Sequence, residues 1–479
     1  MAAALTLALA ACGGGGGSST PATPVPPDTP ATPSIPVGGV TMSLAPASIL
    51  TSQSATLSWS AANARDCVAT GAWSGSQAAS GSTSVTQAQT GSYTYGLTCT
   101  TDSGSVSGSA TLTVTNPTNN VAALTLDDGP QGSSYNVPFV SVTICQPGTS
   151  VCKTIDHIMV DTGSYGLRLI NQGVLNDSLP LPAVTAANGA PLAECAQFVS
   201  GYTWGSVRRA DVKVAGETAR NIPIEIIGDS GSAYATVPSG CSSAGANVGS
   251  VATMGANGIL GVGFFKQDCG TYCAQASDAG FYYGCPSGGC TPVTVPLANQ
   301  VSNPVHDFAY NNNGLQIILP AVSAGGASSI TGSMIFGVNT QPNNQLGAAA
   351  VYKANSSGNF TTTYKGKALT GSFIDSGSNG IYFPDSTLAT CGGGFYCSGS
   401  APLNLSATNA SFDGSNSGVV DFFLDDPRYL PGDNHIAHIG GNPGIASFDW
   451  GLPFFLGRTV SVVFQGQATS KGTGPFWAY

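Results

Sequence analysis

The chain has 479 residues, of which 14 are Lys or Arg and 24 are Asp or Glu. Charged residues therefore make up 8% of the chain, against roughly 25% in an average soluble protein. Fourteen scattered cations argue against extended contact with nucleic-acid phosphates, so we expect no nucleic-acid partner. With so few charged residues, Ser, Thr, Asn and Gly must cover the surface, which favours a secreted, sheet-rich protein. The length is ample for a large core.

The first twelve residues, MAAALTLALAAC, form an apolar run that is too short to span a bilayer as a helix. The run fits the hydrophobic part of a secretory signal, and residues 9–12 (LAAC) resemble the bacterial lipobox. This resemblance implies a lipoprotein signal at residues 1–12, lipidation of Cys12 and an outer-membrane lipoprotein that faces the periplasm or the exterior. The alternative is a plain signal peptide.

Thirteen cysteines are an odd number for an oxidising compartment, and lipidation of Cys12 leaves twelve for disulfides. The favoured pairs are Cys67 with Cys99, Cys145 with Cys152, and Cys391 with Cys397. Two further close pairs, Cys269/Cys273 and Cys285/Cys290, leave zinc binding as a weaker alternative to disulfides. His435 and His438 have a spacing that is typical of metal ligands. They stand among Gly, Pro and Asn residues and not on a helix, so we expect no metal site there. We also expect no cofactor.

Composition divides the rest of the chain. Residues 13–39 are a Gly/Pro-rich tether. Residues 40–116 show alternating apolar and polar positions between Ser- and Gly-rich breaks, which predicts a small β-sandwich. This segment resembles the bacterial Ig-like spacer domains. From residue 121 onward, short β-like runs predict a two-lobed β protein.

Two segments of this block repeat one pattern. Residues 157–167 read HIMVDTGSYGL and residues 372–381 read SFIDSGSNGI. Each has an apolar strand followed by Asp-[Ser/Thr]-Gly-Ser, and the two Asp residues, Asp161 and Asp375, are 375 − 161 = 214 residues apart. Two carboxyl groups brought together in this way can share one proton, because like charges at close range drive their pKa values apart. The pair would then offer a base and an acid at one pH.

These motifs resemble those of the pepsin-like aspartic peptidases. The resemblance extends to residues 257–264 (NGILGVGF), 332–338 (GSMIFGV) and 450–455 (WGLPFF). It implies an all-β, bilobal double β-barrel with lobes at residues 121–312 and 313–479. It also implies catalysis by Asp161 and Asp375, supported by the residues of the two turns, which are Gly163, Ser164, Gly377 and Ser378. The block is similar as well to an uncharacterised family of exported bacterial lipoproteins, and this similarity does not indicate which activity to expect.

The chain departs from the peptidase pattern at the hairpin flap over the cleft. Phe198 stands where that family has a Tyr, and Arg168 stands where it has the Trp that pairs with this Tyr. Gly201 belongs to the same flap, and Tyr202 or Trp204 could substitute for the missing side chain. Arg168 would then be a cleft residue that lowers the pKa of Asp161 or attracts acidic ligands.

The expected function is therefore that of a monomeric, membrane-anchored aspartic endopeptidase that cleaves polypeptides with a water activated by two Asp residues. The alternative is a catalytically inactive protein of the same fold that binds a protein ligand, in the manner of an inhibitor. A surface protein in which the Ig-like domain is the active part is a third possibility.

Overall fold

The computed structural model describes residues 39–50, 54–115, 119–323, 325–430 and 438–479. Its contacts separate Gly14–Thr118 from Asn119–Tyr479, and each unit is described on its own. Strands dominate both units. The α-helices of the described residues are about one turn long: α1 (Ser239–Ser242), α2 (Val251–Met254) and α3 (Thr271–Gln275).

The first unit is a β-sandwich of two sheets. One sheet has the order β1-β3-β6 and the other the order β2-β8-β7-β4-β5. Burial alternates along the strands, as in β3, because one face of each sheet packs against the other. The strands are β1 (Val40–Ala45), β2 (Ser48–Leu50), β3 (Ser54–Ala61), β4 (Ala64–Gly71), β5 (Ser76–Gln77), β6 (Ser80–Thr86), β7 (Gly91–Thr101) and β8 (Gly104–Thr115).

The first lobe of the second unit contains a closed barrel. Six strands follow the order β14-β15-β12-β16-β11-β10, and the pairing of β10 with β14 closes them. They are β10 (Pro138–Cys145), β11 (Cys152–Asp161), β12 (Tyr165–Ile170), β14 (Gly201–Val214), β15 (Glu217–Ile227) and β16 (Gly258–Val262). Strand β13 (Leu192–Phe198) extends β14 into a hairpin, with β17 (Tyr282–Gly284) and β18 (Thr291–Pro292) beyond it.

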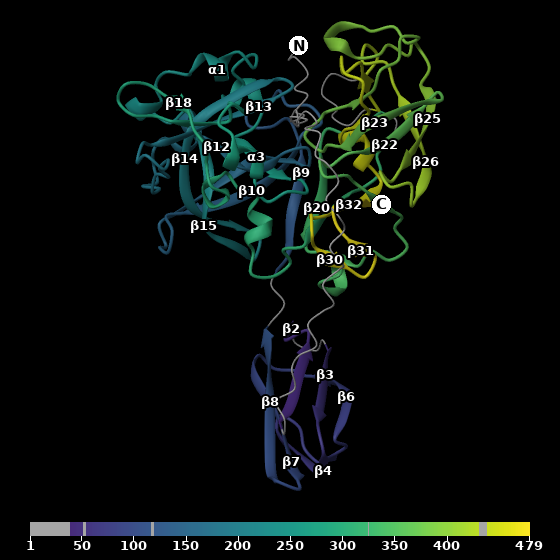
Figure 1. The fold of residues 1–479 in the computed structure, drawn as a ribbon. Coiled ribbons are helices and arrows are strands. Elements are labelled where there is room, and N and C mark those ends of the chain that lie inside the picture. The colour runs from purple at the N-terminus through teal and green to yellow at the C-terminus, as the bar shows by residue number, and fades with distance from the viewer. Residues whose placement is uncertain (1–38, 51–53, 116–118, 324, 431–437) are drawn as a thin grey trace, which may run out of the picture. The chain divides into compact units, whose positions relative to one another are not determined.

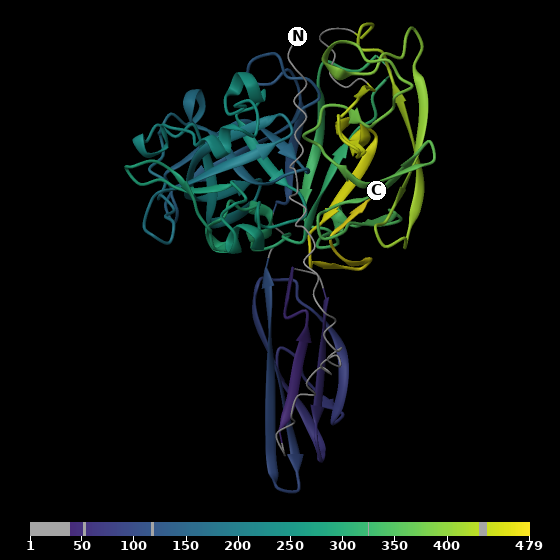
Figure 2. The same ribbon diagram turned by 45° about the horizontal axis from the view of Figure 1, so that its top comes forward.

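The sheet of this barrel continues into the second lobe. Strand β9 (Val121–Leu126) pairs with β10 on one side and with β20 (Ile330–Phe336) on the other. Figure 1 shows β9 and β20 where the two lobes meet, and Figure 2 shows the same lobes side by side after rotation. The continuation consists of β19 (Gly314–Leu319), β29 (Arg458–Val463), β32 (Phe476–Ala478) and β21 (Val351–Lys353).

A separate sheet of seven strands completes the second lobe, in the order β26-β25-β22-β23-β28-β24-β27. Its strands are β22 (Phe360–Tyr364), β23 (Lys367–Ile374), β24 (Ile381–Tyr382), β25 (Leu403–Ala410), β26 (Ser417–Leu424), β27 (Gly440–Gly441) and β28 (Asp449–Trp450). A small hairpin joins β30 (Ala468–Thr469) to β31 (Gly472–Thr473). The expected all-β class, with a small sandwich followed by two barrel-containing lobes, is confirmed.

Disulfides stabilise both units. The three favoured pairs are formed, and Cys67–Cys99 joins residues that are paired across β4 and β7. The cysteines that left zinc as an alternative are also disulfide-bonded, as Cys269–Cys273 and Cys285–Cys290, and Cys195 pairs with Cys241. Thiols bound in disulfides are not available as thiolate ligands, so the zinc alternative is wrong for these four residues. Among the described residues, no helix is both long and apolar enough to cross a membrane.

Candidate active site

The two Asp turns occupy equivalent places in the two lobes. Asp161 ends β11, which runs parallel to β16, and β12 returns antiparallel to β16. Asp375 directly follows β23, which runs parallel to β28, and β24 returns antiparallel to β28. Each Asp therefore stands where a strand ends in a turn, as the repeated sequence pattern predicts. In each lobe, the strands before and after the turn pair with the same third strand.

Hydrogen bonds between the lobes hold the two turns together. The backbone N–H of Thr162 donates to Ser376 Oγ over 3.1 Å, and the N–H of Ser376 donates to Thr162 Oγ1 over 2.9 Å. The hydroxyl of Thr162 donates to Ile374 O at 3.0 Å, and that of Ser376 donates to Val160 O at 2.7 Å. This reciprocal exchange fixes one turn against the other. Neither hydroxyl residue was predicted to have this role.

The carboxyl groups of Asp161 and Asp375 are fully buried and share a hydrogen bond. Each also accepts a 2.8 Å hydrogen bond from the backbone of its own turn, from Gly163 N and Gly377 N respectively. The approach of the turns requires glycine at both positions. A Cβ on Gly163 would lie 2.7 Å from Asp375 Cγ, and one on Gly377 would lie 2.9 Å from Asp161 Cγ.

Two serines complete the hydrogen bonding of the pair. Ser164 donates from its hydroxyl to Asp161 Oδ2, and Ser378 Oγ lies 2.9 Å from Asp375 Oδ2. The structure therefore brings together all six residues that the sequence placed in the two turns. The buried Asp449, which was not predicted, also belongs to this group, because its Oδ2 lies 2.6 Å from Ser378 Oγ.

The surroundings make the two carboxyl groups unequal. Burial raises the pKa of Asp375 well above its ordinary value, and the charge of Asp161 raises it further. Burial also raises the pKa of Asp161, but the hydrogen bond from Asp375 and the positive charge of Arg168 oppose this increase. Asp375 therefore holds a proton more tightly than Asp161 does. The arrangement offers one acid and one base at the same place.

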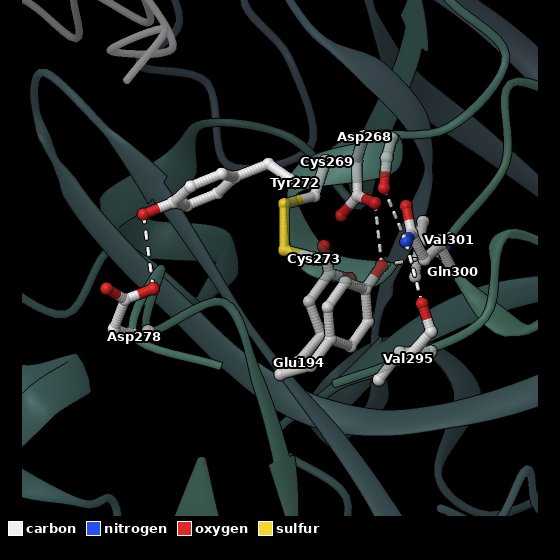
Figure 3. Close-up of a disulfide and its surroundings, with 12 residues drawn as sticks. Glu194, Asp268, Cys269, Tyr272, Cys273, Asp278, Val295, Gln300 and Val301 are labelled. Atoms are coloured by element: carbon white, nitrogen blue, oxygen red, sulfur yellow. Dashed lines mark hydrogen bonds between the residues drawn. A yellow bond between two sulfur atoms is a disulfide. The ribbon is translucent and has the colours of Figure 1, made fainter. Parts of the chain in front are cut away.

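Arg168 is fully buried and does not line an open cleft. Its Nη2 lies 2.5 Å from Glu194 Oε1 and 3.1 Å from Asp268 Oδ2, and its Nε lies 3.3 Å from Glu225 Oε2. Asp268 in turn accepts a 2.6 Å hydrogen bond from Tyr282, and Figure 3 shows Asp268 and Glu194 near the Cys269–Cys273 disulfide. The expectation that Arg168 could attract acidic ligands is wrong, because buried carboxylates already occupy its guanidinium group.

The predicted flap is the hairpin of β13 and β14, with Phe198 paired to Gly201 at its tip. Phe198 is buried and lies 6.0 Å from the Arg168 guanidinium, on the face of the hairpin that carries Glu194. Side chains alternate along strands, so Tyr202 and Trp204 lie on the opposite face. There they pack with the Cys195–Cys241 disulfide. Neither of them takes the place that Phe198 occupies, which corrects the suggested substitution.

Two residues considered in the sequence lie outside the described part of the chain, the lipidation candidate Cys12 and His435.

No curated protein matches this sequence. A family model described as "Protein of unknown function (DUF3443)" matches residues 116–479, which include the whole two-lobed unit but not the sandwich. The chain belongs to the DUF3443 family.

Proposed function

We propose that the protein is an aspartic endopeptidase of the pepsin-like type, with Asp161 and Asp375 as its catalytic pair. The observation that carries this proposal is the shared hydrogen bond between two buried carboxyl groups in equivalent turns. A structural role alone requires neither carboxyl group, because burying an acid is unfavourable unless a partner or a function offsets the cost.

In the proposed reaction, ionised Asp161 takes a proton from a water molecule whose oxygen bonds to the peptide carbonyl carbon. Asp375 gives its proton to the carbonyl oxygen, which forms a neutral diol. Asp161 then returns its proton to the peptide nitrogen as the C–N bond breaks, and a hydroxyl of the diol gives a proton back to Asp375. Protons balance over the cycle, and the products are a carboxylic acid and an amine.

A second function is a non-catalytic protein of the same architecture that binds a polypeptide ligand. The observation that favours it is the complete burial of both carboxyl groups, together with the burial of Phe198, Tyr202 and Trp204 in the hairpin. Under the peptidase proposal, the segments that cover the pair must open for a peptide to reach it. Under the binding proposal, they stay closed and the pair is never exposed.

Cleavage of an unfolded protein at about pH 3–6, where the two members of such a dyad differ in protonation, tests the peptidase proposal. We expect Asp161→Asn and Asp375→Asn each to lower cleavage by at least about a thousandfold, since catalytic groups that act as a unit are lost together. Asp421→Asn, which removes an exposed carboxyl group on β26, is the control and should cleave normally. Cleavage that survives Asp161→Asn rules out catalysis by the two Asp residues. A folded protein that cleaves no substrate favours the non-catalytic binding function.

We further propose that the protein is exported and anchored to the outer membrane through a lipid on Cys12. The six disulfides support export, because such bonds persist in oxidising compartments. Metabolic labelling with a radioactive fatty acid tests the anchor, and an unlabelled mature protein would exclude it.

A further inference from the structure

The equivalence of the two lobes fails at one position beside the pair. In the first lobe, Ile259 of β16 lies opposite Met159, two residues before Asp161. In the second lobe, Asp449 of β28 lies opposite Phe373, two residues before Asp375. The same place in the fold therefore carries a buried Ile in one lobe and a buried Asp in the other. The architecture accepts an apolar side chain here, so the carboxyl group of Asp449 needs its own explanation.

The surroundings of Asp449 do not suit an anion. Its carboxyl group is buried, its Oδ2 lies 2.6 Å from Ser378 Oγ, and its Oδ1 has no hydrogen-bond partner among the described residues. An ionised carboxylate with one unpartnered buried oxygen is strongly disfavoured. A neutral acid, whose proton lies on Oδ2 and points at Ser378, leaves only a carbonyl oxygen without a donor.

The number of protons available to the hydrogen bonds of this site also requires a second neutral acid. Four hydrogen bonds link five side chains in one row, which runs Asp449, Ser378, Asp375, Asp161, Ser164. Each bond uses one proton, and a serine hydroxyl has only one to give. The two serines supply two protons, so the other two must come from carboxyl groups. Two of the three acids are therefore protonated, and one is ionised.

The ionised acid is Asp161. It accepts hydrogen bonds from Gly163 N, Ser164 and Asp375, and the charge of Arg168 acts on it. All donors in the row then point toward Asp161: Asp449 to Ser378, Ser378 to Asp375, and Asp375 to Asp161. The cation, Arg168, lies in the first lobe, whereas the additional acid, Asp449, lies in the second lobe beside Ser378. The two catalytic carboxyl groups, which are otherwise equivalent, therefore have different surroundings.

We propose that Asp449 is a positioning residue that stays a neutral acid and donates a hydrogen bond to Ser378. This bond uses Ser378 as its acceptor and directs the Ser378 hydroxyl to Asp375 Oδ2. Asp375 then cannot donate its own proton to Ser378, so that proton lies between the two catalytic carboxyl groups. The inference rests on the proposed peptidase function for its catalytic consequence, but the protonation of Asp449 can be measured without any reaction. The titratable groups around Asp449 are Asp375, Asp161 and Tyr382, which is paired with Asp449 across β24 and β28.

Infrared difference spectra of the full chain test the protonation. At about pH 6, which is two units above the ordinary pKa of an Asp side chain, an Asp with that ordinary pKa is ionised and gives no protonated-acid absorption. We expect Asp449→Asn, which has nearly the same shape, to lose one protonated-carboxyl band relative to the unsubstituted protein. The exposed control Asp421→Asn should lose none. An unchanged protonated-carboxyl region in Asp449→Asn overturns the inference, whether or not the protein cleaves peptides.

Kinetics test the positioning role. Asn can donate the same hydrogen bond, so Asp449→Asn should keep kcat within about threefold and leave the alkaline limb of the pH profile in place. Asp449→Leu has no donor and should lower kcat about tenfold at unchanged KM, which corresponds to the loss of one hydrogen bond.

An alkaline limb that moves down by a unit or more in Asp449→Asn would show that Asp449 is charged. Equal activity of the Leu and Asn variants would show that Asp449 positions nothing. An absence of any cleavage sensitive to Asp161→Asn refutes the peptidase proposal alone.

Discussion

Single residues at the junction of the lobes determine how closely the two carboxyl groups approach. Thr162 and Ser376 exchange hydrogen bonds between the turns, and Gly163 and Gly377 leave space for the carboxyl group of the opposite lobe. The side chains that hold the pair are thus small, and none of them is charged. Their small size is required because each turn lies directly against the acid of the other.

Substitution of either glycine by alanine tests this close approach. In Gly163→Ala the new methyl group would lie 2.7 Å from Asp375 Cγ, well inside van der Waals contact, so the turns must separate. We expect a loss of about 1–3 kcal/mol in the free energy of unfolding, measured by urea denaturation, as is typical of overpacking in a core. Gly288→Ala is the control, because its Cβ would meet nothing within 4 Å. Equal stability of the two variants would contradict the close approach.

At the scale of elements, four segments of the first lobe assemble one buried ionic cluster. Arg168 comes from β12, Glu194 from β13, Glu225 from β15 and Asp268 from the segment after β16. One guanidinium group faces three carboxyl groups, so not all three can ionise at low cost. Burial accordingly raises the pKa of Glu225 to about 7, although the charge of Arg168 opposes the increase.

The raised pKa of Glu225 predicts a loss of stability toward neutral pH. The folded protein holds this proton up to about pH 7, whereas the unfolded chain releases it near 4.5, so the native state binds more protons in that interval. The contribution is therefore fully present below about pH 4.5 and is lost as the pH rises to about 7. We expect Glu225→Gln, which keeps an acceptor for Thr203, to make the unfolding free energy fall less steeply over that range.

The comparison needs a control, because Glu194, Asp375 and Asp449 also have raised pKa values and contribute in the same direction. Asp421→Asn removes an exposed carboxyl group and should retain the slope of the unsubstituted protein. The prediction is refuted if urea denaturation at several pH values gives Glu225→Gln the same slope as this control.

The residues of the candidate site were predictable to the extent that they lie in one contiguous motif. Asp161 and Asp375 follow apolar strands and precede Gly and Ser, so their turns can be read directly from the sequence. The partners of Arg168 could not be predicted, because Glu194, Glu225 and Asp268 meet it only through strand pairing and loop packing. One signal in the sequence could have identified Asp449. It stands two residues before Gly451, whereas Ile259 stands two residues before the matching Gly261.

At the scale of the whole molecule, the family match covers the two-lobed unit and begins close to where that unit begins. The matched residues 116–479 contain the unit Asn119–Tyr479 and exclude the sandwich strands β1 to β8. The cores are separate too, because one cluster of buried side chains runs from Ile49 to Val114 and another extends from Ala122 to Trp477 through both lobes. The two lobes are thus one folding unit, joined by the pairing of β9 with β20.

Separate cores predict two unfolding transitions in the full chain, and the disulfides allow them to be assigned. Replacing Cys67 and Cys99 by Ala removes the bond between β4 and β7 and should lower the stability of the sandwich by roughly 2–4 kcal/mol. Replacing Cys145 and Cys152 removes a bond within the barrel of the first lobe and should shift only the other transition. Calorimetry distinguishes the two, because units that fold independently respond to one substitution each. A single transition that both double variants shift equally would mean that the sandwich and the lobes unfold as one unit.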